Sequence, residues 1–170
     1  MDFYQSLGHL IVGSRLRRLS EYWIAEINKV YQQEKIDFDA SWFPLFYILS
    51  QKEEVSIRQL SDHIQVSHSA VSQLVSNLKK RGLVQSNTDE GDARKQLIRF
   101  TPEGICLLEK IQPIWQSITQ VMEEIACENE EVAYLLSSIT ALESEFAVKN
   151  LSERIRSKHL KLWKTRSIMA

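Results

Sequence analysis

The sequence predicts a mainly α-helical fold that contains one small β-hairpin. Three observations support this prediction. Long apolar stripes at helical spacing lie towards both ends of the chain, residues 56–78 contain two short helical patterns that each begin with a capping residue, and residues 83–100 read as two strands around a polar loop.

At 170 residues the chain is long enough for one well-buried core. Hydrophobic residues make up 44% and charged residues 25%, which is typical of a soluble globular protein. The sequence does not open with a basic segment and an apolar run, and no stretch approaches the roughly 18 apolar residues of a membrane span. We therefore expect a cytoplasmic protein with no membrane partner, and we expect Cys106 and Cys127 to be free, half-buried thiols.

The net charge of -1 conceals a segregation of charge along the chain. Residues 56–100 carry 7 basic and 4 acidic side chains, residues 101–148 carry 1 and 9, and residues 149–170 carry 7 and 1. Two basic blocks around an acidic one indicate that part of the surface meets a polyanion. Ordinary solvated faces are the alternative interpretation.

The first apolar stripe lies between Leu16 and Tyr31, and neither glycine nor proline interrupts it. It predicts one long amphipathic helix, and we assign residues 1–36 to an N-terminal dimerisation helix. The pattern breaks at residues 37–39, and residues 42–49 are apolar almost all round, which predicts a short buried helix with Pro44 in its first turn. The residues of the first stripe are Leu16, Leu19, Trp23, Ile27 and Val30.

A second long stripe follows residue 104, and a later pattern runs less regularly into the basic tail. A single small domain cannot easily bury amphipathic helices at both ends of its sequence, so we predict a homodimer and assign residues 105–170 to C-terminal dimerisation helices with a basic tail. A monomeric helical bundle is the alternative. The stripe contains Ile105, Leu108, Ile111, Trp115, Ile118, Met122 and Ile125, and the later pattern contains Leu135, Ile139, Leu142, Phe146, Leu151, Ile155 and Leu162.

Two short helices joined by a tight turn are predicted in the middle of the chain. Ser56 and Gln59 have the capping-box spacing, so a helix should begin at Ile57. Residues 65–67 then form a turn, and Ser67 can cap a second helix. This arrangement is a helix-turn-helix. Its inward positions are expected at Ile57, Leu60 and Ile64 on the first helix and at Ala70, Val71, Leu74, Val75 and Leu78 on the second.

The second helix ends in three cations followed by Gly82, which suits the helix dipole and a left-handed exit. Residues 83–87 and 95–100 read as strands, and Thr101 with Pro102 starts a new helix. A helix-turn-helix followed by a hairpin is a winged helix-turn-helix, which we assign to residues 37–104.

An exposed helix fits the major groove of B-DNA, so polar side chains on the outer face of the second helix are candidate base contacts. A solvated, serine-rich helix face is the alternative. Basic residues at the end of this helix are candidates for phosphate contact, although the helix dipole alone also favours them. These DNA-binding candidates are Ser67, His68, Ser69, Ser72, Gln73, Asn77, Lys79 and Lys80, with Arg81 beside them.

Residues 7–146 resemble the multiple antibiotic resistance regulator (MarR) family, and residues 89–104 are the most specific part of the match. The family pattern there is Asp-x-Arg, a hydrophobic strand and Leu-Thr-x-x-Gly. The positions that fit it are Asp92, Arg94, Thr101 and Gly104, with Phe100 in the place of the leucine.

The resemblance implies a homodimeric DNA-binding repressor that binds a pseudo-palindromic operator with a helix in the major groove and a wing in the minor groove. Arg94 would enter the groove or be held by Asp92, which would have a structural role in the wing, and Lys95 is a further wing candidate for DNA contact. Ala93 stands where many relatives have a second arginine, and the wing tip is acidic at Asp89 and Glu90. Both departures weaken the expected minor-groove contact.

Three sensing mechanisms can be compared with the sequence. Peroxide sensing in the family uses a cysteine in the first long helix, and residues 1–55 contain none. The four histidines are scattered without a spacing typical of a zinc site, so no metal or other cofactor is expected. The third mechanism is a small lipophilic or aromatic effector. Its pocket would involve Tyr22, Trp23, Trp42, Phe46, Tyr47 and Trp115, which are otherwise core residues.

Catalysis is not expected, because the sequence contains no glycine-rich phosphate loop and no nucleophile clustered with a base. The alternative function is a winged-helix module that binds protein without binding DNA. The acidic wing tip and the small net positive charge of residues 56–100 leave that alternative open.

Overall fold

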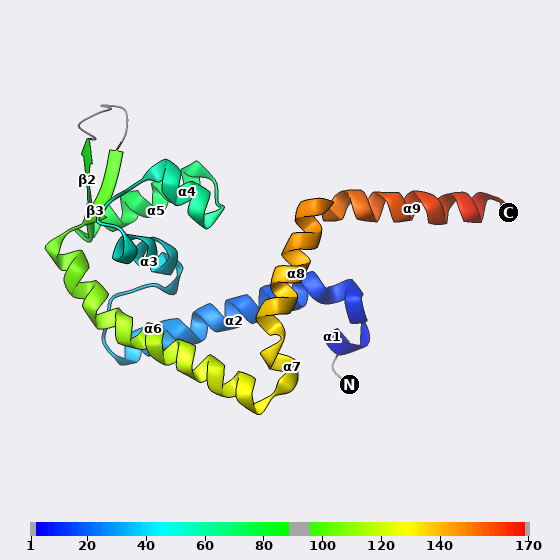
Figure 1. Cartoon of the computed structure of the whole chain (residues 1–170), viewed down its shortest axis with the longest axis horizontal. Coiled ribbons are helices and arrows are strands. Elements are labelled where there is room, and N and C mark those ends of the chain that lie inside the picture. The colour runs from blue at the N-terminus through cyan, green and yellow to red at the C-terminus, as the bar shows by residue number, and fades with distance from the viewer. Residues whose placement is uncertain (1–2, 89–95, 169–170) are drawn as a thin grey trace. The chain divides into compact units, whose positions relative to one another are not determined.

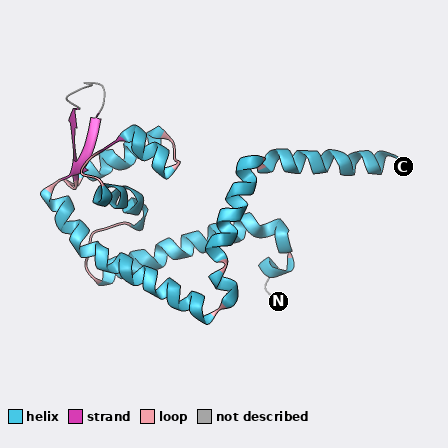
Figure 2. Cartoon of the chain, in the orientation of Figure 1, coloured by secondary structure: helices cyan, strands magenta, loops and turns pink. Residues whose placement is uncertain are grey.

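The computed structural model of the chain describes residues 3–88 and 96–168. Helices make up most of the described chain, and strands occur in one small region (Figure 2). The predicted mainly α fold with a small β-hairpin is therefore confirmed. The chain divides into two units, Met1–Trp115 and Gln116–Ala170, and each is described by itself.

The first unit contains the helix-turn-helix and the sheet. Figure 1 shows α3, α4 and α5 beside the hairpin formed by β2 and β3. Its elements are α1 (Phe3–Ser6), η1 (Gly8–Ile11), α2 (Val12–Gln33), η2 (Ala40–Trp42), α3 (Phe43–Gln51), β1 (Val55–Ser56), α4 (Ile57–Ile64), α5 (His68–Lys80), β2 (Val84–Thr88), β3 (Gln96–Phe100) and the first part of α6 (Pro102–Glu128).

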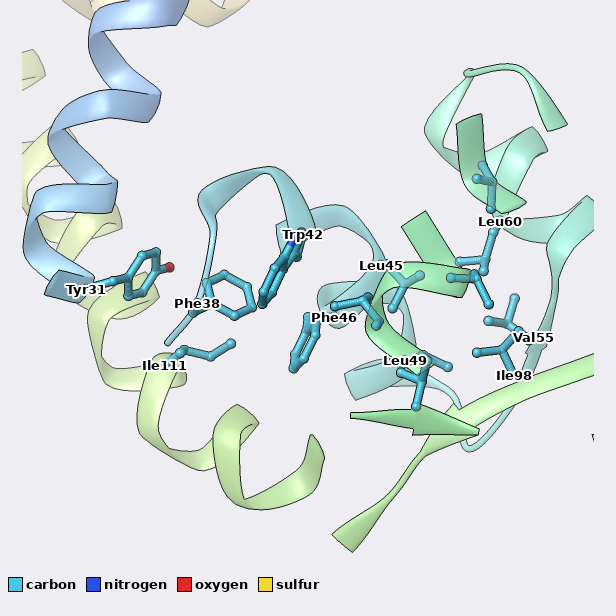
Figure 3. Packing of buried hydrophobic residues seen from close by; sticks show 14 residues of the cluster. Tyr31, Phe38, Trp42, Leu45, Phe46, Leu49, Val55, Leu60, Ile98 and Ile111 are labelled. Atoms are coloured by element: carbon cyan, nitrogen blue, oxygen red, sulfur yellow. The ribbon is translucent and has the colours of Figure 1, made fainter. Parts of the chain in front are cut away.

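Aromatic rings dominate the half of the core that joins α2, α3 and α6 (Figure 3). Phe38 lies between the rings of Tyr31 and Phe46, with centroid distances of 4.9 and 5.0 Å. The break at residues 37–39 is confirmed, and it supplies this central ring. Trp42 and Phe46 are core residues rather than the walls of an open pocket.

Tyr31 connects α2 to α6, because its hydroxyl accepts a hydrogen bond of 3.1 Å from Nε1 of Trp115. Burial raises the pKa of Tyr31 above its ordinary value of 10.0, against the opposing effect of this hydrogen bond. The phenol therefore stays neutral in the core at physiological pH.

The sheet has three antiparallel strands in the order β1-β3-β2. Ile98 of β3 lies between Val55 of β1 and Ser86 of β2 and is fully buried. The sequence prediction omitted β1, because a two-residue strand is too short to show alternation. The predicted hairpin strands are confirmed within one residue at each described end.

The second unit consists of the remainder of α6, α7 (Glu130–Ala133), α8 (Leu135–Val148) and α9 (Leu151–Ile168). The prediction of one pattern continuing from residue 135 into the tail is wrong, because Lys149 is extended and the helix is interrupted there. Asn150 begins the next helix: its side-chain oxygen accepts a hydrogen bond from the backbone N–H of Glu153.

Two further corrections concern exposure. Cys106 and Cys127 are free, but both are exposed rather than half-buried, because each lies off the apolar stripe of α6. Ala70 is also exposed, since it lies at the edge of the buried stripe formed by Val71, Val75 and Leu78. Among the described residues, no helix has the length and apolar character to cross a membrane.

Candidate nucleic-acid interface

The turn between α4 and α5 is closed by local hydrogen bonds. Ser56 and Gln59 form the predicted capping box at the start of α4. After α4 the chain reverses at Gln65, which has a left-handed backbone with φ of 57°. The Ser61 hydroxyl then donates a hydrogen bond of 2.7 Å to the Val66 carbonyl, and Ser67 begins α5. These contacts fix the direction in which α5 leaves α4.

Helix α5 has one buried face and one polar face. Val71, Val75 and Leu78 are buried against the body of the unit. Ser67 is the N-cap, and its hydroxyl accepts a hydrogen bond from the backbone N–H of Ala70 at 3.3 Å. Apart from Lys79 and Lys80 at its end, the exposed polar residues of this helix are His68, Ser69, Gln73, Ser76 and Asn77, while Ser72 is half-buried.

The structure brings the polar candidates on α5 together on one helix. Ser69 and Ser67 lie within 3.0 Å through their hydroxyl oxygens, and Ser72 Oγ lies 3.5 Å from Nδ1 of His68. Ser76 was not among the candidates, although it follows Gln73 by three positions and Ser69 by seven. That spacing places it on the same face and was a signal available in the sequence.

The basic residues at the end of α5 have different surroundings. Lys79 donates a hydrogen bond of 2.6 Å from Nζ to the Ser86 hydroxyl and so links α5 to β2. Arg81 forms an ion pair of 2.9 Å with Asp37 and lies over the ring of Trp42. Lys80 is exposed. Among the described residues at this end of the helix, Lys80 is thus the cation that is least engaged in contacts within the protein.

The described part of the hairpin carries one candidate that the sequence prediction did not include. Arg99 of β3 is exposed and lies opposite Gln85 of β2. With the Gln85 amide oriented to satisfy both groups, its oxygen accepts a hydrogen bond of 2.9 Å from Nε of Arg99. The predicted wing residues Asp92, Arg94 and Lys95 lie outside the described residues.

The junction between the hairpin and α6 is close-packed. The Thr101 hydroxyl donates to the Gly82 carbonyl at 2.5 Å and accepts from the Gly104 backbone N–H at 3.1 Å. Gly82 has a φ of 71°, which confirms its predicted left-handed exit. The junction therefore ties the end of α5 and the base of the hairpin to the start of α6.

Two of the proposed effector-pocket residues, Tyr47 and Trp115, belong to one aromatic group. The ring centroids of Phe43 and Trp115 are 4.9 Å apart, and those of Tyr47 and Trp115 are 6.2 Å apart. Phe43 and Tyr47 are exposed where α3 meets α6. We call Phe43, Tyr47 and Trp115 the aromatic patch; it does not include Tyr22 or Trp23, which are exposed on α2.

The chain is similar to transcription regulators in both sequence and fold. A family model described as the MarR family matches residues 36–95. The HTH-type transcriptional repressor IacR from Pseudomonas putida is 29% identical over 105 residues, which span 58% of this chain and 63% of IacR. The matched segment thus covers less than two thirds of that relative.

Two solved structures show the same fold. The MepR–DNA complex from S. aureus has a TM-score of 0.67 and 21% identity, over 78% of this chain and 96% of MepR. The second is BpsR from Bordetella bronchiseptica, whose DNA binding is regulated by 6-hydroxynicotinic acid. It has a TM-score of 0.60 and 25% identity, over 76% of this chain and 92% of BpsR. IacR is named as a transcriptional repressor and MepR was solved bound to DNA, and neither is described as an enzyme. The chain is therefore similar to the MarR family over residues 36–95, and it shares its fold with the two solved structures.

Proposed function

We propose that this protein is a sequence-specific DNA-binding transcriptional repressor. The observation that carries the proposal is the polar outer face of α5, which lies opposite a face buried by Val71, Val75 and Leu78. A helix held in this way can enter a major groove while its buried face stays attached to the protein. The excess of basic over acidic residues in the segment 56–100 favours a polyanionic partner.

Each candidate is assigned a role by its chemistry. Gln73 is suited to a bidentate pair with adenine, and the neighbouring hydroxyl and amide groups can accept or donate at base edges. Lys80 is assigned to phosphate contact. Lys79 is assigned to the same role, in which its ammonium group would exchange its hydrogen bond with Ser86 for one with a phosphate oxygen. In the wing we assign Arg94 to the minor groove, Lys95 to phosphate and Asp92 to orientation of Arg94. The residues proposed at base edges or at the adjoining phosphates are Ser67, His68, Ser69, Ser72, Gln73, Ser76 and Asn77.

The proposed active form is a homodimer built from α2 and from the C-terminal helices that precede α9. Leu16 and Leu19 on α2 are 45% and 51% exposed, and Leu136 on α8 is 77% exposed. Burying such side chains is favourable by about 25 cal/mol per Å² of apolar surface, which favours association with a second copy. A two-fold dimer would bind a pseudo-palindrome whose half-sites lie about 34–36 Å apart.

We further propose that an aromatic effector relieves repression by stacking on the aromatic patch. The rings of Phe43 and Tyr47 are exposed, so a planar ligand can reach them. The regulation of DNA binding in BpsR by 6-hydroxynicotinic acid, an aromatic acid, supports this class of effector. The ligand would contact both α3 and α6, the second of which continues into the other unit.

Replacing Gln73 by alanine is expected to relax base preference without abolishing binding. Loss of a bidentate base contact should reduce discrimination between the preferred duplex and its single-base variants by about 1–3 kcal/mol. Competition binding with a panel of such duplexes measures this quantity. Gln120→Ala is the matched control, because Gln120 is an exposed glutamine on α6 outside residues 56–101.

The wing variant separates base reading from general affinity. Arg94→Ala should weaken binding to all duplexes by a similar factor, since a groove or phosphate cation adds mainly electrostatic affinity. If the Gln73 and Arg94 variants both bind every duplex as the wild type does, the assigned interface is wrong. If the affinity of the wild type for duplex DNA does not depend on salt, the alternative of a winged-helix module that binds protein is favoured.

A further inference from the structure

Helix α9 carries a dense group of cations at the end of the chain. Seven basic residues and one acidic residue lie between residues 149 and 170. Of these cations, Arg154 is held in place: its guanidinium donates to the Glu145 and Lys149 carbonyls and pairs with the Glu145 carboxylate at 2.7 Å. Arg154 therefore caps α8 and fixes the direction in which α9 leaves it.

The other described cations of α9, Arg156 and Lys158, are exposed, and they do not hold two helices together as Arg154 does. Arg156 and Lys158 make no ion pair with any described residue. The sequence of the helix continues with Lys161, Lys164 and Arg166. Five cations thus follow the capping arginine within a single helix.

The arrangement of these residues favours a polyanion over a protein or membrane surface. Successive residues of an α-helix are about 100° apart, so Arg156 and Lys158 project from nearly opposite sides. Leu151 and Ile155 share one side, whereas Leu160 lies on the other, and all three are exposed. An apolar stripe is what a partner helix or a lipid interface needs, and in the described part of α9 it is limited to Leu151 and Ile155 in the first turns of the helix.

We propose that α9 is a second DNA-contacting element, which binds the phosphate backbone of duplex DNA outside the base pairs read by α5. This inference rests on the proposed function, because it takes duplex DNA as the ligand. The helix has 18 residues and is about 27 Å long, enough to follow about 8 base pairs. It would add affinity but no base preference, since phosphates carry no sequence information.

A second copy of the chain offers a competing anionic surface. Glu123, Glu124 and Glu128 at the end of α6 are exposed, as are Glu130 and Glu131 of α7. These glutamates form a local patch, which would engage only one side of α9. Cations on opposite sides of the helix are better matched by the two phosphate backbones that border a groove of DNA.

The test compares the full-length protein with two double variants of equal charge. Arg156→Gln with Lys158→Gln removes two cations from α9, whereas Arg17→Gln with Lys29→Gln removes two exposed cations from α2. Affinity for a preferred and a random duplex is measured over a series of salt concentrations, and sedimentation gives the oligomeric state. The α9 variant should lower the logarithmic salt slope by about 1–2 and weaken binding to both duplexes by about 5- to 30-fold near 0.15 M salt.

The expected result is that the α2 variant keeps the wild-type slope and that all three proteins have the same oligomeric state. An unchanged slope in the α9 variant would overturn the inference while leaving the proposed function intact. A slope that falls only because the variant dissociates would instead assign α9 to the acidic surface of a second copy. If the wild type binds no duplex, the proposed function and this inference fail together.

Discussion

Substitution of Gly104 by alanine is expected to lower the free energy of unfolding by about 3 kcal/mol or more. Gly104 is buried in the first turn of α6. A Cβ atom at this position would overlap the carbonyl oxygen of Leu83 and lie 2.9 Å from Cδ1 of Phe100. The ring of Phe100 can move, but the backbone of Leu83 is held by two hydrogen bonds. Its carbonyl accepts one from the backbone N–H of Thr101, and its N–H donates the other to the Leu78 carbonyl. The added methyl group must therefore displace backbone at the base of the hairpin.

Chemical denaturation measures this change, with Gly13→Ala as the matched control. Gly13 lies in α2, and a Cβ there would meet no atom within 4 Å. Alanine should therefore be neutral or stabilise the chain by up to about 1 kcal/mol, because it favours the helix. Equal unfolding free energies for the Gly104 variant and the wild type would contradict the close packing described at this junction.

Truncation of Phe46 to alanine is expected to cost about 3–5 kcal/mol of unfolding free energy. Phe46 is 0% exposed, and its ring lies 5.0 Å from that of Phe38 and 4.9 Å from that of Phe100. It thus connects the aromatic core under α2 to the strand that precedes α6. Removing it leaves a cavity that the surrounding elements cannot readily fill.

The same substitution at Phe3 provides the comparison. Phe3 is 66% exposed in α1, so Phe3→Ala should change the unfolding free energy by less than about 0.5 kcal/mol. Thermal or urea unfolding of the three proteins gives the values. A loss of less than about 1 kcal/mol for Phe46→Ala would show that the ring is not at the centre of the core.

Local chemistry explains why much of the fold could be predicted from the sequence. The limits of α4 and α5 follow from Ser56 with Gln59 and from Ser67, whose side chains bond to backbone groups only three residues away. The start of α6 follows from Thr101 and Pro102 in the same way. Such signals do not depend on the rest of the chain.

Features that depend on tertiary contacts or on very short segments were not predicted. The strand β1 has two residues and exists through its pairing with β3. The exposure of Cys106 depends on which face of α6 the core covers. The break before α9 had a local signal, because Asn150 precedes Glu153 by three positions, but the apolar spacing across it was given more weight.

In the candidate DNA-binding site, too, local features could be predicted from the sequence and tertiary contacts could not. Helical periodicity distinguishes the polar face of α5 from its buried face, so Gln73 and Asn77 could be selected from the sequence. Periodicity does not show that Lys79 bonds to Ser86 or that Arg81 pairs with Asp37, since these partners come from other elements. The long-range contacts therefore reduce the set of cations at the end of α5 that are available to DNA.

Selection of bound fragments from a pool of random duplexes, at low ionic strength and with the mass of the complexes determined, tests the DNA-binding function most directly. We predict enrichment of an inverted repeat with half-sites about one helical turn apart, bound by two copies of the chain, with an affinity that falls steeply as salt is added. A monomeric protein that retains no duplex under these conditions would contradict this function.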